Sequence, residues 1–213
     1  EIILPIIEEF SGKKVGDDFG LCMNPEFLKQ GSAVKDAFNP DRIVIGEYDK
    51  RGGDILEVLY SGFDCPKMRC DIKAAELIKY AANSLLATKI SFANEFARIS
   101  EKFNVDVYEV MEGIGFDYRI NSRFLNAGCG FGGSCFPKDV NAIISIAEEV
   151  GVDTPVLDSV IQTNELQPIH LVNIIKETVG NLKGKTVGFL GLAFKPNTDD
   201  VRETRALPII RGL

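Results

Sequence analysis

The chain has 213 residues, of which 45% are hydrophobic and 26% charged, a composition that fits a soluble protein with one or two packed domains. The formal net charge of −7 argues against a general nucleic-acid-binding protein, and no apolar run reaches the length of a membrane span. Five cysteines, an odd number without Cys-x-x-Cys pairs, argue against a disulfide framework and a zinc site. We therefore expect no metal and a reducing, cytoplasmic location.

The first seventy residues predict the closing part of an α/β sheet. The chain opens inside a helical pattern, without the basic segment typical of a signal peptide. Short apolar and β-branched runs predict strands, and a longer run between them predicts a helix. The expected elements are helix 1–10, strands 19–23, 42–46 and 66–70, and helix 50–61. Such alternation is typical of an α/β domain.

The stretch 67–112 contains neither Gly nor Pro and predicts one long helix over 72–103. Apolar residues recur there at steps of three and four, and such a helix would be roughly 45–50 Å long. We expect it to bridge two domains and to carry a homodimer contact on a second apolar face with Leu86, Ile90 and Ala93. The alternative is an ordinary core helix of a helical domain.

The second half of the chain predicts further helices and one long irregular loop. Asp106 precedes a short helix as its N-cap, and Thr154 and Pro155 start another that Pro168 would break or kink. The expected elements are helices 107–112, 138–150 and 155–180, a buried strand over 184–190 and a helix from 203. The loop 115–133 is long enough that a functional role is expected.

Four glycines crowd the stretch Gly128-Cys-Gly-Phe-Gly-Gly-Ser-Cys-Phe-Pro-Lys-Asp139. Glycine permits unusual backbone conformations and close approach of a ligand, and Pro137 suits the first turn of a helix. Cys135 is therefore expected just before a helix N-terminus, where the helix dipole and Lys138 make a thiol more reactive. Asp139 is close enough in sequence to act on a water beside the sulfur. The alternative is a glycine-rich turn around a buried, inert cysteine.

The run Gly-Phe-Gly-Gly-Ser-Cys-Phe-Pro-Lys-Asp resembles the catalytic cysteine loop of the UDP-glucose/GDP-mannose dehydrogenase family. Members of that family oxidise the C6 alcohol of a nucleotide sugar to a carboxylate with two NAD⁺. The resemblance implies that Cys135 is the nucleophile that traps the aldehyde as a thiohemiacetal, and that Asp139 handles water and protons. It also implies a substrate contact at Gly132 and an NAD contact at Ser134.

The stretch Asn24-Pro-Glu-Phe-Leu28 follows a predicted strand, where ligand crevices of α/β sheets lie, and resembles a second motif of the family. The resemblance implies that Glu26 contacts NAD and helps to activate water, and that Phe27 and Leu28 line the sugar pocket. The family often has Glu where this chain has Gln30, so no role is assigned to that position.

Lys79 and Asn83 are four residues apart and therefore share one face of the predicted long helix. The run Glu76-Leu-Ile-Lys-Tyr-Ala-Ala-Asn83 resembles the family's helix motif, which implies that both residues stabilise negative charge on the substrate oxygen. Without the family, both would be interpreted as solvated surface residues. His170, the single histidine, has no motif around it and is expected to be structural, so proton transfer falls to carboxylates and lysine.

Two loops complete the resemblance. The arginine of Phe116-Asp-Tyr-Arg119 resembles one that reaches a substrate in a partner subunit. The stretch after it resembles a loop over the nucleotide sugar, which implies substrate contacts at Phe124, Leu125 and Asn126. In the run 191–203, Lys195 would pair with the substrate diphosphate and Arg202 with the NAD diphosphate, in a context that suits phosphate binding.

The resemblance implies an α/β fold with a central all-helical linker and dimerisation domain, and with partial Rossmann-like units at both ends. The expected domains are the end of the NAD-binding domain (1–70), a central helical dimerisation and catalytic domain (71–180) and the start of the UDP-sugar-binding domain (181–213). The sequence contains no Gly-x-Gly-x-x-Gly. We therefore expect a middle piece of a longer enzyme that is inactive alone.

The expected activity is the oxidation of UDP-glucose to UDP-glucuronate by a homodimer in two NAD-dependent steps. GDP-mannose or another UDP-sugar is the alternative substrate, although Asn-Pro-Glu-Phe-Leu disfavours N-acetylated sugars. Two interpretations from other classes stay open: a non-catalytic dimerisation module built on helix 72–103, and a thiol hydrolase or acyltransferase without NAD. The missing glycine motif favours both, whereas the joint presence of Cys135, Glu26, Lys195 and Arg202 disfavours them.

Overall fold

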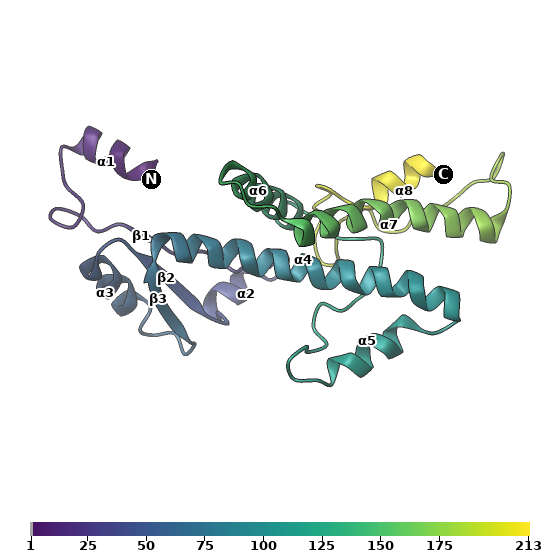
Figure 1. Cartoon of the computed structure of the whole chain (residues 1–213), viewed down its shortest axis with the longest axis horizontal. Helices are drawn as coiled ribbons and strands as arrows, with labels where there is room; N and C mark the ends of the chain where they lie inside the picture. Colours follow the sequence, from purple (N-terminus) through teal and green to yellow (C-terminus); the bar gives the residue numbers. More distant parts are fainter. Residues whose placement is uncertain (1) are drawn as a thin grey trace. The chain divides into compact units, whose positions relative to one another are not determined.

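A computed structural model describes residues 2–213, which divide into two units, the first ending at Ala81 and the second covering residues 82–213. The first unit carries a small sheet with helices and the second contains helices joined by loops (Figure 1), which confirms the predicted fold class. No helix in the described part of the chain combines the length and the apolar character that crossing a membrane requires.

The first unit is built on a three-stranded sheet. Its middle strand β2 (Ile43–Glu47) pairs in parallel with β3 (Lys67–Asp71) and antiparallel with the short β1 (Cys22–Met23). The helices that belong to this unit entirely are α1 (Ile3–Ser11), α2 (Ala33–Phe38) and α3 (Lys50–Leu59). All three predicted strands and both predicted helices are confirmed. Helix α2 was missed because six residues are too few to show a helical period.

Gly46 allows β2 to meet the start of helix α4 (Ile72–Phe103). A Cβ at Gly46 would lie 2.5 Å from the Cβ of Ala75 and 3.0 Å from the Cα of Ile72. Ala75 is fully buried. The sheet and the first turn of α4 therefore approach each other more closely than any residue other than glycine permits.

Arg69 ties β3 to β2 and to α3. Its guanidinium donates to Asp54 at 2.5 Å, to Glu57 at 2.9 Å and to Glu47. The hydrogen bonds to Asp54, Glu47 and Glu57 raise the pKa of Arg69 above its ordinary value. Asp49 starts α3 by accepting a hydrogen bond from the backbone N–H of Gly52 at 3.0 Å.

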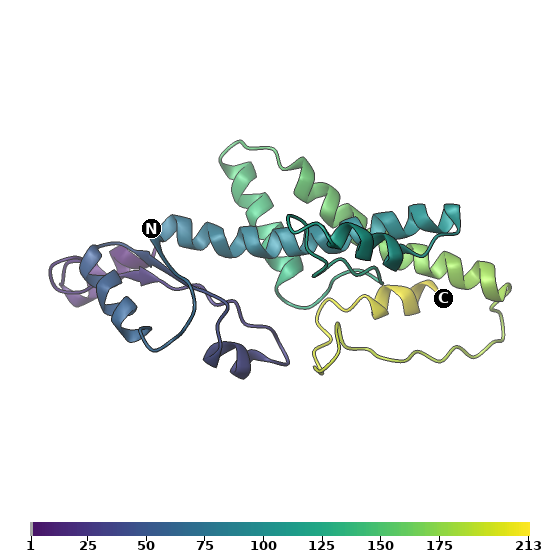
Figure 2. The same cartoon turned by 90° about the horizontal axis from the view of Figure 1, so that it is seen from below.

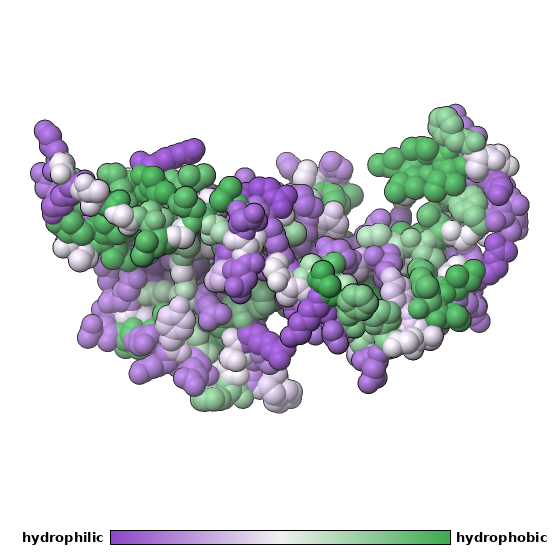
Figure 3. Space-filling view, turned by 180° about the vertical axis from the view of Figure 1, so that it is seen from behind, coloured by the Kyte–Doolittle hydropathy of each residue, from purple (hydrophilic) through white to green (hydrophobic). Residues whose placement is uncertain are grey.

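Helix α1 has no buried residue, and its apolar side chains face outward. Ile3, Ile6 and Phe10 are all exposed, and α1 shows as a hydrophobic patch in Figure 3. The apolar face of α1 is thus uncovered within the described residues.

The predicted long helix is confirmed with both of its bounds, as α4. In the second unit, α4 runs parallel to α7 (Pro155–Val179), because successive contacts advance along both helices in the same direction (Figures 1 and 2). These contacts are Ser91 to the carbonyl of Val160 at 3.0 Å, Arg98 to Gln167 at 2.9 Å, and His170 to Glu101 at 2.8 Å. His170 lies in this helix contact, which fits the structural role expected of it.

Two apolar clusters form the core of the second unit. The first joins α4, α6 (Phe136–Glu149) and α7 through Ala87, Phe131, Val140 and Val160, and Ile90 packs against it. The second joins α4 to α5 (Val107–Gly115) through Ala93, Met111 and Leu125. Of the three residues predicted for a partner face, Ala93 is buried in the second cluster and the half-buried Ile90 packs against the first, so both contact their own chain, whereas Leu86 is half-buried and belongs to neither cluster.

The predicted strand over 184–190 is wrong. Residues 180–205 contain no helix or strand and form a long loop with turns that leads to α8 (Ala206–Gly212), as Figure 2 shows. Leu190 is 98% exposed. A strand needs a neighbour for its backbone hydrogen bonds, and no described segment pairs with this one. Helix α7 also continues through Pro168, where a break or kink was predicted, so no break occurs there.

Candidate active site

Cys135 lies where the glycine-rich loop meets α6. It occupies the N-cap position of that helix, and Pro137 lies in the first turn. The Cys135 thiol is exposed, and its sulfur lies 3.6 Å from Oγ of Ser134. The prediction of a cysteine just before a helix N-terminus is confirmed, and the alternative of a buried cysteine is wrong.

The glycines of the loop are required by packing within the chain. A Cβ at Gly132 would lie 2.2 Å from the carbonyl oxygen of Glu203, and one at Gly133 would lie 2.7 Å from the ring of Phe194. Gly133, at φ +78°, also donates its N–H to the carbonyl of Arg202 at 3.0 Å. At these two positions the close approach that we expected from a ligand is made by the chain's own segment 194–203.

Asp139 and Asn83 lie together in the second unit. Nδ2 of Asn83 donates to Oδ2 of Asp139 at 2.6 Å, and Nζ of Lys138 donates to Oδ1 at 2.6 Å. Both Asn83 and Asp139 are buried. The backbone N–H of Asp139 donates to the carbonyl of Cys135 at 2.8 Å in the first turn of α6. Three of the predicted catalytic residues are thus joined by hydrogen bonds.

A cavity of about 500 Å³ lies beside the cysteine loop, and Ser134, Lys138 and Arg202 line it. A hydroxyl group and two cations are suitable donors for a diphosphate. The hydrogen bonds that Arg202 donates to the carboxylate of Asp200, the shortest at 2.7 Å, raise the pKa of Arg202. Arg202, predicted to contact the NAD diphosphate, and Ser134, predicted to contact NAD, thus line the same cavity, together with Glu165 and Glu203.

In the first unit, Lys79 binds the Asn24–Leu28 motif. Nζ of Lys79 donates to the carbonyl of Glu26 at 2.6 Å and lies 3.0 Å from its Oε1. The other carboxylate oxygen of Glu26 accepts from the N–H of Leu28 at 2.6 Å. The Glu26 carboxylate therefore has a fixed place while most of its surface stays open to solvent.

Two cations hold the ring of Phe27. The guanidinium of Arg42 lies 3.7 Å from the ring centroid, and Nζ of Lys79 lies 5.5 Å from it. Both contacts have the geometry of cation–π attraction. Arg42 was not among the predicted site residues, because a lone Arg at the start of a predicted strand gives no sign of a contact 15 residues away.

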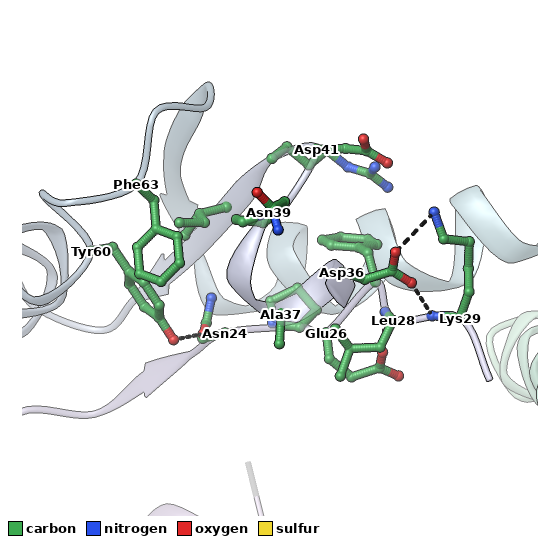
Figure 4. A pocket seen from close by; sticks show the side chains of 15 residues that line it. Asn24, Glu26, Leu28, Lys29, Asp36, Ala37, Asn39, Asp41, Tyr60 and Phe63 are labelled. Atoms are coloured by element: carbon green, nitrogen blue, oxygen red, sulfur yellow. Dashed lines mark hydrogen bonds and ion pairs between the residues drawn. The ribbon is translucent and has the colours of Figure 1, made fainter. Parts of the chain in front are cut away.

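A cavity of about 210 Å³ adjoins this motif, lined by Asn24–Leu28, Tyr60 and Phe63 among others. Figure 4 shows Tyr60 and Phe63 at one end of it and Lys29 with Asp36 at the other. Phe27 and Leu28, predicted to line the sugar pocket, thus line a cavity of the first unit.

The predicted substrate residues in and near the loop 115–133 differ in their contacts and in their exposure. Arg119 pairs with Asp117 at 2.5 Å, which raises the pKa of Arg119 and lowers that of Asp117. Phe124, at φ +67°, packs edge-on against Phe136. Leu125 is buried in the core, so its side chain is not available to a ligand and only its backbone could contact a substrate.

Three predicted substrate residues stand apart from the rest. Arg119, Asn126 and Lys195 make no hydrogen bond to another predicted site residue within residues 2–213. Lys195 lies over the ring of its neighbour Phe194, with Nζ 5.6 Å from the centroid. The structure therefore groups Glu26, Phe27 and Lys79 in one unit and Asn83, Cys135 and Asp139 in the other. 

Sequence reasoning also missed the buried amides Asn94, Asn164 and Gln167, which bind the backbone of the cysteine loop. All three occur on helices, where Asn and Gln are mostly solvated. Their spacing in the sequence therefore gave no signal of a buried contact with the loop.

Comparison with known proteins gives the class of this protein. Profiles of three domains match it in order: the NAD-binding domain over 1–64, the central domain over 73–166 and the UDP-binding domain over 188–213. The chain belongs to the UDP-glucose/GDP-mannose dehydrogenase family, which confirms the resemblance seen in its motifs.

Several individual members of this family are similar to the chain in sequence and in structure. The chain is 48% identical to UDP-glucose 6-dehydrogenase TuaD of Bacillus subtilis, in an alignment that covers 90% of this chain and 42% of that protein. It is 46% identical to UDP-glucose 6-dehydrogenase AglM of Haloferax volcanii, in an alignment that covers 100% of this chain and 50% of that protein. A solved UDP-glucose dehydrogenase from Pyrobaculum islandicum is 46% identical, with a TM-score of 0.90, over 97% of this chain and 48% of that one. The chain thus spans about half the length of these relatives.

Proposed function

We propose that this chain is the catalytic portion of an enzyme that oxidises UDP-glucose to UDP-glucuronate. The observation that carries the proposal is the exposed Cys135 thiol at the N-terminus of α6, one helical turn from an Asp139 that is bonded to Asn83. The relatives described above are named UDP-glucose 6-dehydrogenases, which supports this substrate over GDP-mannose or another UDP-sugar.

The chemistry occurs twice at C6 of the sugar. The alcohol loses a hydride and a proton to become an aldehyde, and the thiol of Cys135 adds across the carbonyl to form a thiohemiacetal. Loss of a second hydride and a second proton gives a thioester. Water then cleaves the carbon–sulfur bond, which releases the carboxylate and restores the thiol.

The remaining residues stabilise charge and move protons. Lys79 and Asn83, which are four residues apart on α4, stabilise the negative oxygen that develops on C6. Glu26 and Asp139 transfer protons to and from water, and the hydrogen bonds described above hold both carboxylates in place. The nucleotide sugar is bound by the remaining predicted substrate residues and by Arg119 of a partner subunit. The residues of this chain are Phe27, Leu28, Phe124, the backbone of Leu125, Asn126, Gly132 and Lys195.

NAD⁺ accepts the hydride in each oxidation when it is bound. Ser134 and Arg202, which share one cavity, bind it, Arg202 at the diphosphate, and the resemblance to the family assigns a further NAD contact to Glu26. The enzyme acts as a homodimer in a reducing compartment such as the cytoplasm, where the thiol stays free.

The test replaces Cys135 in an enzyme of the relatives' full length that contains this chain. Cys135→Ala should abolish UDP-glucuronate while a slow first oxidation to the aldehyde persists, because the thiol is needed only for the covalent intermediate. Cys129→Ser, which removes the other exposed thiol of the loop, is the control and should leave product formation unchanged. Normal UDP-glucuronate formation by Cys135→Ala would refute the proposed function.

A further inference from the structure

Three buried amide side chains bind the loop that precedes Cys135. Asn94 on α4 and Asn164 and Gln167 on α7 are 0%, 2% and 3% exposed. They bind the backbone of Gly128 and Phe131, which belong to no helix or strand. Buried backbone groups outside regular structure need such partners, so these amides replace the missing secondary structure of the loop.

Asn164 pairs with Phe131 much as one strand residue pairs with another. Its Oδ1 accepts from the N–H of Phe131 at 2.7 Å, and its Nδ2 donates to the carbonyl of Phe131 at 3.0 Å. Because the two atoms are used with opposite polarity, only one orientation of the amide fits. Gly130, at φ +102°, permits this approach, since a Cβ there would lie 2.6 Å from Oδ1 of Asn164.

Gly128 is held from two helices. Its N–H donates to Oδ1 of Asn94 at 2.7 Å, and its carbonyl accepts from Nε2 of Gln167 at 2.8 Å. Arg98 donates to Oε1 of Gln167 at 2.9 Å and so fixes which end of that amide faces the loop. The backbone of the loop is therefore fixed on both sides of Cys129.

These four hydrogen bonds lie directly ahead of Cys135. Only residues 132–135 separate Phe131 from α6, and the N–H of Gly133 is bound as well. The backbone of residues 132–135 therefore has little conformational freedom between the bound loop and the start of α6. We infer that Asn164, supported by Asn94 and Gln167, is a positioning residue that keeps the Cys135 sulfur at a constant place in the site. The inference rests on the proposed function, in which Cys135 is the nucleophile.

The first measurement needs neither a variant nor activity. Residue-resolved hydrogen exchange on the wild-type chain should show the amides of Gly128 and Phe131 exchanging as slowly as those in the middle of α4. Fast exchange at both amides would overturn the inference. Because no turnover is involved, this result is independent of whether the proposed function holds.

The second measurement uses Asn164→Asp, which replaces the Nδ2 donor by an oxygen facing the carbonyl of Phe131. Losing this buried bond should speed exchange of the Phe131 amide about tenfold or more, and should change the alkylation rate of Cys135 relative to Cys129 by about threefold or more. Asn173→Asp, an exposed residue of the same helix, is the matched control and should change neither. If Asn164→Asp is folded and matches the control, the inference is wrong.

If Asn164→Asp does not fold, Gln167→Glu tests whether the buried amides position Cys135. It loses the donor to Gly128 but keeps an acceptor for Arg98, and the same two measurements apply to the Gly128 amide and the thiols. In the full-length enzyme, kcat should fall about tenfold with KM for UDP-glucose unchanged, because substrate binding does not depend on the thiol position. A rise in KM alone would overturn the positioning role. Absence of oxidation by the wild-type enzyme would count against the proposed function only.

Discussion

Cys135 and Cys129 expose their thiols, whereas the other three cysteines are half-buried. Burial raises the pKa of Cys22 and Cys70, so at neutral pH these two contain less of the reactive thiolate. We expect limiting iodoacetamide at neutral pH to modify Cys135 first, because it lies at a helix N-terminus beside Lys138. Labelling of Cys22 and Cys70 should increase only as the pH rises. Peptide mapping by mass spectrometry measures each site.

A Cys129→Ser variant separates exposure from reactivity in this experiment, since Cys135 is then the single exposed thiol of the loop. Its labelling rate should not change. If Cys22, Cys65 or Cys70 were labelled first and Cys135 stayed untouched, the proposed mechanism would lose its nucleophile.

Lys79 is expected to act in both oxidations, unlike Cys135. Its ammonium is fixed by two contacts with Glu26 and would face the same substrate oxygen in each step. Lys79→Ala should slow both hydride transfers by roughly 10²–10³, the loss found when one donor to a developing oxyanion is removed. Single-turnover NADH formation, started from UDP-glucose or from the aldehyde, measures the two steps separately.

Lys102→Ala, in the last turn of the same helix, is the control for that measurement and should retain both rates. A Lys79→Ala enzyme that loses only the second oxidation would show that the lysine acts through the thioester step instead.

Local sequence motifs predicted the structural position of a residue where that position depends only on neighbouring residues in the chain. Pro137 was enough to put Cys135 at a helix start, and Asp106 was enough to cap α5. The partner of Asn83 was not predictable, because Asp139 is 56 residues away and meets it only when α4 and α6 pack together. The same holds for Arg42 on Phe27, which depends on tertiary packing within the first unit.

At the scale of elements, the close packing of β2 against α4 can be tested by a single substitution at Gly46. Gly46→Ala would place its Cβ 2.5 Å from that of Ala75, with the backbone of Ile72 and Asp71 also within 3.2 Å. Because backbone cannot give way cheaply, the substitution should lower the free energy of unfolding by about 1–3 kcal/mol. Urea unfolding monitored by circular dichroism measures the change.

Gly62→Ala is the control in the same unit, since a Cβ there meets nothing within 4 Å. Equal stability of the Gly46→Ala and Gly62→Ala proteins would mean that β2 and α4 do not pack closely at Gly46.

Elements could be predicted where the signal is contained in the element itself. The absence of Gly and Pro together with a steady apolar period predicted both ends of α4. The run 184–190 has the composition of a strand, but strand formation depends on a partner that no described segment provides. Its apolar residues therefore predicted an element that the chain does not form.

For the whole molecule, the surface of α4 retains a feature that supports a homodimer. Leu85, Phe92 and Ile99 are 63%, 44% and 43% exposed and are spaced by seven residues, so they form one apolar stripe. A spacing of seven is the pattern by which helices pair along a seam. This stripe differs from the predicted face with Leu86, Ile90 and Ala93, of which Ala93 is buried and Ile90 packs within its own chain.

We therefore expect the chain to sediment as a dimer at micromolar concentration and Phe92→Glu to sediment as a monomer, because a charge in the middle of the stripe would be buried without a partner. Phe10→Glu, which alters an equally apolar, exposed side chain on α1, is the control and should stay dimeric. Circular dichroism should show the same helix content in all three proteins. A monomeric wild-type chain would rule out the stripe as a dimer contact, and a Phe92→Glu dimer would place the contact on another surface.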